Sequence, residues 1–109
     1  YGGGDISFYT NKTNRDENTL IISRYALSKV CVRFIFNKFY LNDSGLSINS
    51  KKIELQNYIN YYLLDNKMQE YIYKNCTSGS IQHNLNMNLF YNIKIKTSNS
   101  THYIGKCKH

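Results

Sequence analysis

Apolar and polar residues alternate most regularly between Ile81 and Ile95. The odd positions of this segment carry apolar residues or a histidine: Ile81, His83, Leu85, Met87, Leu89, Tyr91, Ile93 and Ile95. The even positions are polar except for Phe90. A period of two is typical of a β-strand that packs one face on a core and exposes the other. We therefore predict one long strand, or two joined by a bend, and expect Leu89→Asp to unfold the domain while Asn88→Asp is tolerated.

Shorter strand patterns occur on either side of the middle of the chain. Val30–Leu41 has apolar residues on both faces and predicts a central strand, while Thr19–Tyr25 predicts a short apolar one. Asp5–Thr10 has weaker strand character. Residues 42–45 (Asn-Asp-Ser-Gly) favour a turn, because they tolerate left-handed backbone or bond to their own backbone. A turn at residues 97–101 followed by a strand over His102–Cys107 predicts a C-terminal hairpin.

The middle of the chain carries a helical pattern. Ser50 is a candidate N-cap, and no Gly or Pro interrupts Lys51–Leu64. Residues spaced three and four apart predict one buried stripe on this helix: Leu55, Tyr58, Ile59, Tyr62 and Leu63. Asp65-Asn66 is a candidate stop, and Lys67–Asn75 fits either a continued helix or another strand, of which we favour the helix. Residues 77–80 (Thr-Ser-Gly-Ser) predict a break.

This order of elements predicts an α+β fold for a single domain over residues 1–109, with a flexible N-terminus at residues 1–4. We expect an antiparallel sheet of about four to six strands packed against one principal helix. In outline the order is also similar to that of the OB barrel, whose helix falls between its third and fourth strands. Bacterial toxin B subunits of similar size use that barrel to bind cell-surface glycans, so an OB-like barrel is the alternative fold.

Composition narrows the class of protein. Hydrophobic residues make up 41% and aromatic residues 15%, which is enough to build a core and excludes a disordered chain. No apolar stretch approaches the ~20 residues of a transmembrane helix. The net charge of +7 favours anionic partners, although the lysines are scattered and only residues 94, 96, 106 and 108 suggest a local patch. The abundance of Asn, Ile, Tyr and Lys, without Pro or Trp, is typical of an AT-rich genome.

The three cysteines lie far apart and lack the paired spacing of a zinc site. Cys31 stands between two valines, where a free thiol packs as a small hydrophobe. Cys76 and Cys107 have polar neighbours, so we predict a disulfide between them with Cys31 left free. Such a bridge requires an oxidising compartment and therefore indicates a secreted, extracellular or periplasmic protein.

Candidate chemistry is sparse. The histidines have no metal-ligand spacing, and we expect neither a metal nor a cofactor. His83 lies on the apolar face of the alternating segment, where a partly buried core histidine is the simpler interpretation. His102 begins the last predicted strand. Together, His83 and His102 are the candidate acid and base of a metal-independent ribonuclease, in which one imidazole takes a proton and the other donates one.

These observations favour a small, secreted or exported, non-catalytic binding module. It would contact a glycan or a protein partner, on a cell surface or in a secreted complex, through Tyr, Asn and Lys side chains. The candidate ligand-binding residues are Tyr61, Tyr73, Lys94 and Lys96. A homo-oligomer fits as well, while nucleic acid is less favoured because no RNP-like or cold-shock motif is present.

Two alternatives stay open. One is the small basic ribonuclease or toxin domain that uses His83 and His102. The other is a structural or assembly accessory subunit whose long strand over Ile81–Ile95 pairs with another copy.

Overall fold

The computed structural model describes residues 1–2, 9–79, 81–97 and 100–107, without the side chains of residues 106 and 107. Its elements follow the chain in this order: β1 (Thr19–Ser23), β2 (Val32–Ile35), β3 (Gly45–Ile48), α1 (Ile53–Leu64), α2 (Asn66–Asn75), β4 (Thr77–Ser78), β5 (Asn84–Leu85), α3 (Met87–Tyr91), β6 (Lys94–Lys96), β7 (Thr101–Tyr103) and α4 (Ile104–Cys107). The strand predicted over Asp5–Thr10 lies largely outside the described residues, as does half of the predicted flexible N-terminus.

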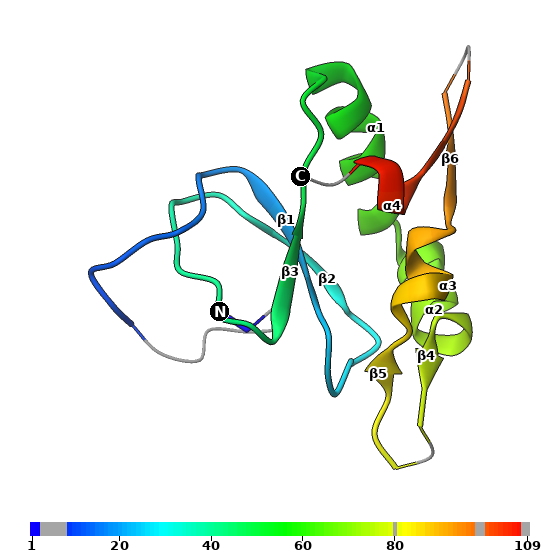
Figure 1. Ribbon diagram of the computed structural model, residues 1–109, viewed down its shortest axis with the longest axis horizontal. Coiled ribbons are helices and arrows are strands. Elements are labelled where there is room, and N and C mark those ends of the chain that lie inside the picture. The colour runs from blue at the N-terminus through cyan, green and yellow to red at the C-terminus, as the bar shows by residue number, and fades with distance from the viewer. Residues whose placement is uncertain (3–8, 80, 98–99, 108–109) are drawn as a thin grey trace.

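A three-stranded antiparallel sheet of order β2-β1-β3 separates two sides of the molecule (Figure 1). The central strand β1 pairs Leu20 with Phe34 of β2 and with Ile48 of β3. Its apolar run is completely buried, with Leu20, Ile21 and Ile22 all at 0% exposure. Successive side chains of a strand point to opposite faces, so these three residues anchor a core on each side of the sheet.

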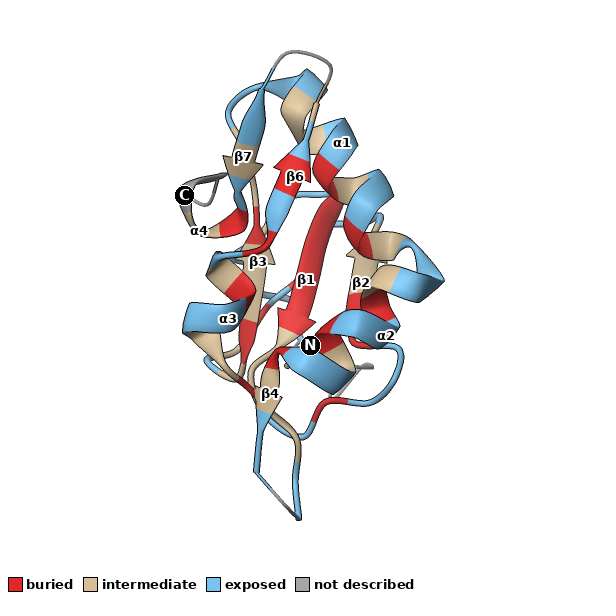
Figure 2. Ribbon diagram, turned by 90° about the vertical axis from the view of Figure 1, so that its right-hand side faces the viewer, coloured by how far each residue is buried: buried red, intermediate tan, exposed pale blue. Residues whose placement is uncertain are grey.

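The two cores differ greatly in size. On one side, the sheet is covered by α1 and α2 together with the C-terminal hairpins and short helices. Figure 2 shows the buried residues of this layer in red. That core includes Leu20, Ile59, Ile72 and Phe90. On the other side, loops cover the sheet and bury a small cluster of Ile21, Phe39 and Leu41. The partly buried side chains of Tyr1 and Ile35 pack against this cluster.

The predicted α+β class is confirmed, but its finer architecture is wrong. The described strands form three small antiparallel sheets with two main helices, not one sheet of four to six strands on one helix, and therefore no OB-like barrel. The segment Val30–Leu41 contributes only β2, which is an edge strand. Val30 and Phe36 are exposed by 57% and 71% because the chain leaves the sheet on both sides of β2.

The long strand predicted over Ile81–Ile95 is also wrong. A helical turn, α3, interrupts it, because the Asn86 side chain accepts a hydrogen bond from the Leu89 N–H at 3.1 Å and caps the helix. The predicted facing holds for Leu85, Ile93 and Ile95, which are buried, but fails elsewhere in the segment. Phe90, the one exception to the alternation, is completely buried, whereas Leu89 is 48% and Ile81 is 99% exposed. Leu89→Asp is therefore not expected to unfold the domain.

The helical prediction is confirmed as two helices that meet at Asp65. The carboxylate of Asp65 accepts a hydrogen bond from the Met68 N–H at 3.1 Å and caps α2. On α1 only Ile59 and Leu63 of the predicted stripe are fully buried. Ser50 does not cap α1. The N-cap position is occupied by Lys52, whose side chain forms no capping hydrogen bond.

The C-terminal hairpin is confirmed, although it is shorter than predicted. β6 pairs with β7 so that Ile95 lies opposite His102 and Lys96 opposite Thr101. After Tyr103 the chain turns into α4 rather than continuing as a strand, and the completely buried Ile104 joins this helix to the larger core.

Candidate functional site

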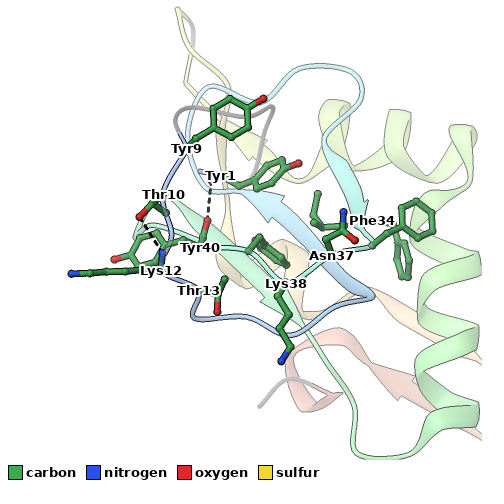
Figure 3. Close-up of a pocket in the computed structure, with 12 residues that line it drawn as sticks. Tyr1, Tyr9, Thr10, Lys12, Thr13, Phe34, Asn37, Lys38 and Tyr40 are labelled. Atoms are coloured by element: carbon green, nitrogen blue, oxygen red, sulfur yellow. Dashed lines mark hydrogen bonds between the residues drawn. The ribbon is translucent and has the colours of Figure 1, made fainter.

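A groove of about 380 Å³ lies on the loop-covered side of the sheet (Figure 3). We call it the aromatic groove, because six aromatic residues contribute to its lining: Tyr1, Tyr9, Phe34, Phe36, Phe39 and Tyr40. The Phe34 side chain also packs against the larger core, and the Phe36 ring lies beside it at that end of the groove. The remaining side chains are mostly polar or cationic: Thr10, Lys12, Thr13, Asn37 and Lys38, with Ile35 beside them. The groove is therefore built from Tyr1 and two stretches of chain, residues 9–13 and residues 34–40.

Hydrogen bonds hold these two stretches together. The side chain of Asn14 accepts from the Leu41 N–H at 2.7 Å and donates to the Leu41 carbonyl oxygen at 2.9 Å. Arg15 and Phe39 form an isolated antiparallel bridge, with the Phe39 carbonyl accepting from the Arg15 N–H at 3.0 Å. A polar residue that satisfies both backbone groups of a neighbouring segment fixes the position of that segment. The wall formed by residues 9–13 is thus set by the residues that follow it.

The floor of the groove is apolar and rigid. Phe39 is 6% exposed and belongs to the small core, where the Tyr1 ring meets it edge to face with centroids 5.6 Å apart. The backbone of Tyr1 is held on both sides, by a hydrogen bond to the Tyr40 carbonyl oxygen and another from the Asn42 N–H, each 2.9 Å long. The floor is therefore anchored by the small core and by backbone hydrogen bonds.

Two of these rings stand almost free in solvent. Tyr9 is 88% exposed and Phe36 is 71% exposed. The Phe36 ring packs edge-on against Phe34, with centroids 5.1 Å apart. Large aromatic side chains exposed beside a cavity are typical of recognition surfaces, because they offer a wide contact area at a low cost in conformational entropy.

The groove carries positive charge. Lys12 and Lys38 approach it from the two different stretches and direct their ammonium groups to different sides, as Figure 3 shows. Neither lysine forms a salt bridge with another described residue, and no described carboxylate lines the groove. Thr10, Thr13 and Asn37 add hydroxyl and amide groups, which both donate and accept hydrogen bonds.

A second hollow, of about 350 Å³, lies at the junction of α1 and α2. We call it the helix-junction hollow, and its lining is Tyr61, Tyr62, Asp65, Lys67, Met68 and Tyr71. The rings of Tyr61 and Tyr71 are 82% and 49% exposed. The predicted ligand-binding residue Tyr61 therefore lies in a cavity, although not in the aromatic groove.

The other predicted ligand-binding residues lie elsewhere. Tyr73 is turned inward and stacks on His83, with ring centroids 4.5 Å apart. Lys94 and Lys96 are exposed on the same face of β6, where Lys94 lies 5.9 Å from the ring centroid of Tyr103. The structure thus brings the two lysines together, but it does not join them with Tyr61 and Tyr73 in one site.

The structure separates the two histidines. His83 precedes β5 and shares a hydrogen bond of 3.1 Å with the Thr77 hydroxyl, while His102 on β7 shares one of 2.8 Å with the Ser100 hydroxyl. The β4–β5 hairpin and the β6–β7 hairpin lie at opposite ends of the molecule (Figures 1 and 2). The imidazoles therefore do not form the acid–base pair that the ribonuclease alternative requires.

The cysteines depart from the predicted pairing. Cys31 is a buried free thiol, as predicted, but Cys76 is also a free thiol and is only 2% exposed. Cys76 follows α2 and packs in the larger core. Its side chain is therefore buried even though its neighbours in the sequence are polar. The predicted bridge to Cys107 is absent from this structure, and the Cys107 side chain lies outside the described residues.

Burial changes the chemistry of both thiols. It raises the pKa of Cys31 from 9.0 to about 11 and also raises the pKa of Cys76. Because the thiolate is the nucleophile and the metal ligand, neither thiol is prepared for covalent catalysis.

The described part of the chain offers neither a metal site nor a membrane span. Its His, Cys, Asp and Glu side chains include no group of three placed to hold a metal ion. None of the described helices has the length and apolar character needed to cross a bilayer. No protein-family model, curated protein or solved structure matches the chain.

The residues of the aromatic groove were missed in the sequence because nothing in the pattern joins residues 9–13 to residues 34–40. One signal was present. Phe36 belongs to an apolar alternation that continues beyond Ile35, the last residue of β2. Its ring is exposed just after the end of that strand.

Proposed function

We propose that the protein is a non-catalytic binding module that recognises a glycan through the aromatic groove. The observation that carries the proposal is the lining of the groove, in which exposed rings stand next to neutral hydrogen-bonding side chains. Pyranose rings present one apolar C–H face and a rim of hydroxyl groups. An aromatic ring supports the apolar face, and hydroxyl and amide side chains bond the rim.

The dimensions of the groove suit such a ligand. Its volume of about 380 Å³ falls in the lower part of the range of ~300–1,000 Å³ for small-ligand sites. The groove opens at the surface, so a short end of a longer chain of sugars fits as well as a free oligosaccharide. The described lining residues include neither a histidine nor a carboxylate, the side chains used most often in acid–base catalysis, and this favours a binding role.

Saturation-transfer NMR on a panel of oligosaccharides tests the proposal. Wild-type protein should transfer saturation to at least one glycan, and Tyr9→Ala and Phe36→Ala should each weaken that binding about tenfold. Both side chains are more than two-thirds exposed, so their loss should leave the folded state intact. Tyr61→Ala, an equally exposed tyrosine outside the groove, is the matched control and should bind as wild type.

Export forms part of the same proposal. A module whose ligand is a cell-surface glycan works outside the cytoplasm, so we infer a secreted, extracellular or periplasmic protein. Detection of the native protein only in the cytoplasmic fraction of its source would contradict this inference.

A second candidate function is supported by the helix-junction hollow. Tyr61, Tyr71 and Met68 give it an apolar, aromatic lining of the kind that receives an anchor side chain of a protein partner. Tyr61→Ala and Tyr71→Ala should then abolish capture of a protein partner from the native source, while Tyr9→Ala leaves capture unchanged. The opposite pattern would assign the partner to the aromatic groove.

A further inference from the structure

We infer that the glycan recognised by the aromatic groove is acidic, carrying carboxylate or sulfate groups that Lys12 and Lys38 bind. This inference rests on the proposed function and specifies its ligand. The groove holds two lysines without a described carboxylate, in a chain whose net charge is +7. Unpaired cations on both sides of a cavity attract anions and disfavour a cationic ligand.

The placement of the lysines separates them from the general surface charge. Two other described lysines have local partners: Lys74 bonds Glu70 at 2.6 Å, and Lys94 lies over the Tyr103 ring. What distinguishes Lys12 and Lys38 is their place in the lining of the aromatic groove. Lys12 and Lys38 flank the exposed rings from different stretches of chain and point to different sides (Figure 3). Two cations at different sides of one groove suit a ligand with more than one acidic group, as in a sugar chain with repeated acidic units.

The same lining favours an acidic saccharide over a nucleic acid. Phosphate recognition prefers the planar fork of arginine, which bonds two phosphate oxygens at once. Arginine is absent from the described lining of the groove. Arg15 donates to the Ser47 hydroxyl and Arg24 donates to the Asp43 carbonyl oxygen, so both are engaged elsewhere. Lysines act as point charges without that geometry, so the groove attracts anionic groups but lacks the paired donors of a dedicated phosphate site.

Binding of matched oligosaccharides tests the inference. We would titrate the full chain with a heparin-derived tetrasaccharide and with its desulfated, carboxyl-reduced counterpart, which has the same backbone without the charges. The acidic form should bind at least tenfold more tightly, and its affinity should fall as salt is added because the Debye length shortens. Lys12→Gln and Lys38→Gln should each weaken binding of the acidic form about threefold to fivefold.

Lys94→Gln and Lys96→Gln are the controls, because these exposed lysines lie on β6 and outside the groove. If they weaken binding as much as the groove variants do, general charge attraction accounts for the result and the inference fails. Equal binding of charged and uncharged forms would overturn the inference but leave the proposed function standing. Binding of neither form, nor of any glycan in the panel, would overturn both. Displacement of the acidic tetrasaccharide by equimolar single-stranded RNA would assign the groove to nucleic acid and overturn both.

Discussion

Phe90 has the largest side chain among the described residues that are completely withdrawn from solvent, and it fixes α3 against the larger core. Its neighbour Leu89 occupies the third position of the same helical turn and is half exposed. The two residues are adjacent and both apolar, so hydrophobicity alone does not separate them. The helical turn capped by Asn86 decides which of them enters the core.

We predict opposite outcomes for substitutions at these two positions. Phe90→Ala should lower the free energy of unfolding by about 3–5 kcal/mol, because it removes a buried ring and leaves a cavity. Leu89→Asp should change it by less than about 1 kcal/mol, since a carboxylate in the first turn of a helix is favoured. Urea denaturation monitored by circular dichroism measures both. A larger loss from Leu89→Asp would restore the strand interpretation of Ile81–Ile95.

Cys31 predicts a dependence of stability on alkaline pH. Burial holds its pKa at about 11 in the folded protein, whereas the unfolded thiol ionises near 9.0. Between these values the unfolded state loses a proton that the folded state keeps, so rising pH favours unfolding. The contribution of Cys31 is therefore complete below pH 9 and lost as the pH rises toward 11. Other groups titrate in this range, so the quantity to measure is the difference from Cys31→Ala, and an unchanged difference across the range would contradict the prediction.

At the scale of elements, the junction between α1 and α2 shows what a residue pattern can determine. Apolar spacing predicted helical structure on both sides of Asp65, and the structure confirms it. The spacing could not show that the helices are separate, because the buried positions continue through the junction. Capping by the Asp65 carboxylate, together with an extended backbone at that residue, supplies the break.

We predict that Asp65→Ala lowers the free energy of unfolding by about 1 kcal/mol, the usual contribution of an N-cap. Asp65→Asn keeps an oxygen that accepts from the Met68 N–H and should retain most of that stability. Thermal unfolding of the three proteins distinguishes the cap from a charge effect. An equal loss in both variants would show that the negative charge, rather than the hydrogen bond, stabilises α2.

At the scale of the whole molecule, the sequence predicts the class of fold better than its arrangement. β1, α1, α2 and the C-terminal hairpin follow local apolar patterns, and such patterns are readable along the chain. The separation into three small sheets depends on which long-range contacts form. Phe36 lies outside the sheet, because the chain after β2 turns to form a backbone bridge between Phe39 and Arg15, a residue more than twenty positions earlier. The aromatic groove depends on the same contact, and for that reason no sequence pattern brings residues 9–13 and residues 34–40 together.

The two sides of the sheet should also differ in how readily they open. The larger core joins the sheet to both main helices, while the groove side buries only the small cluster around Ile21, Phe39 and Leu41 among the described residues. Segments with few buried apolar contacts open at a lower free energy than the global transition. The groove side is therefore expected to be the first part of the fold to open.

Native-state hydrogen exchange measures this difference. The Leu41 N–H, which bonds the Asn14 side-chain oxygen, should exchange at least tenfold faster than the N–H groups of Ile59 and Ile72 in the buried faces of α1 and α2. Asn14→Ala removes the acceptor and should accelerate exchange at Leu41 further while leaving both helices unchanged. Bound acidic tetrasaccharide should slow exchange at Leu41, because a ligand of the folded groove stabilises it by mass action. Equal exchange rates at Leu41 and at the two helix positions would contradict the prediction, because they would mean that the groove side and the larger core unfold together.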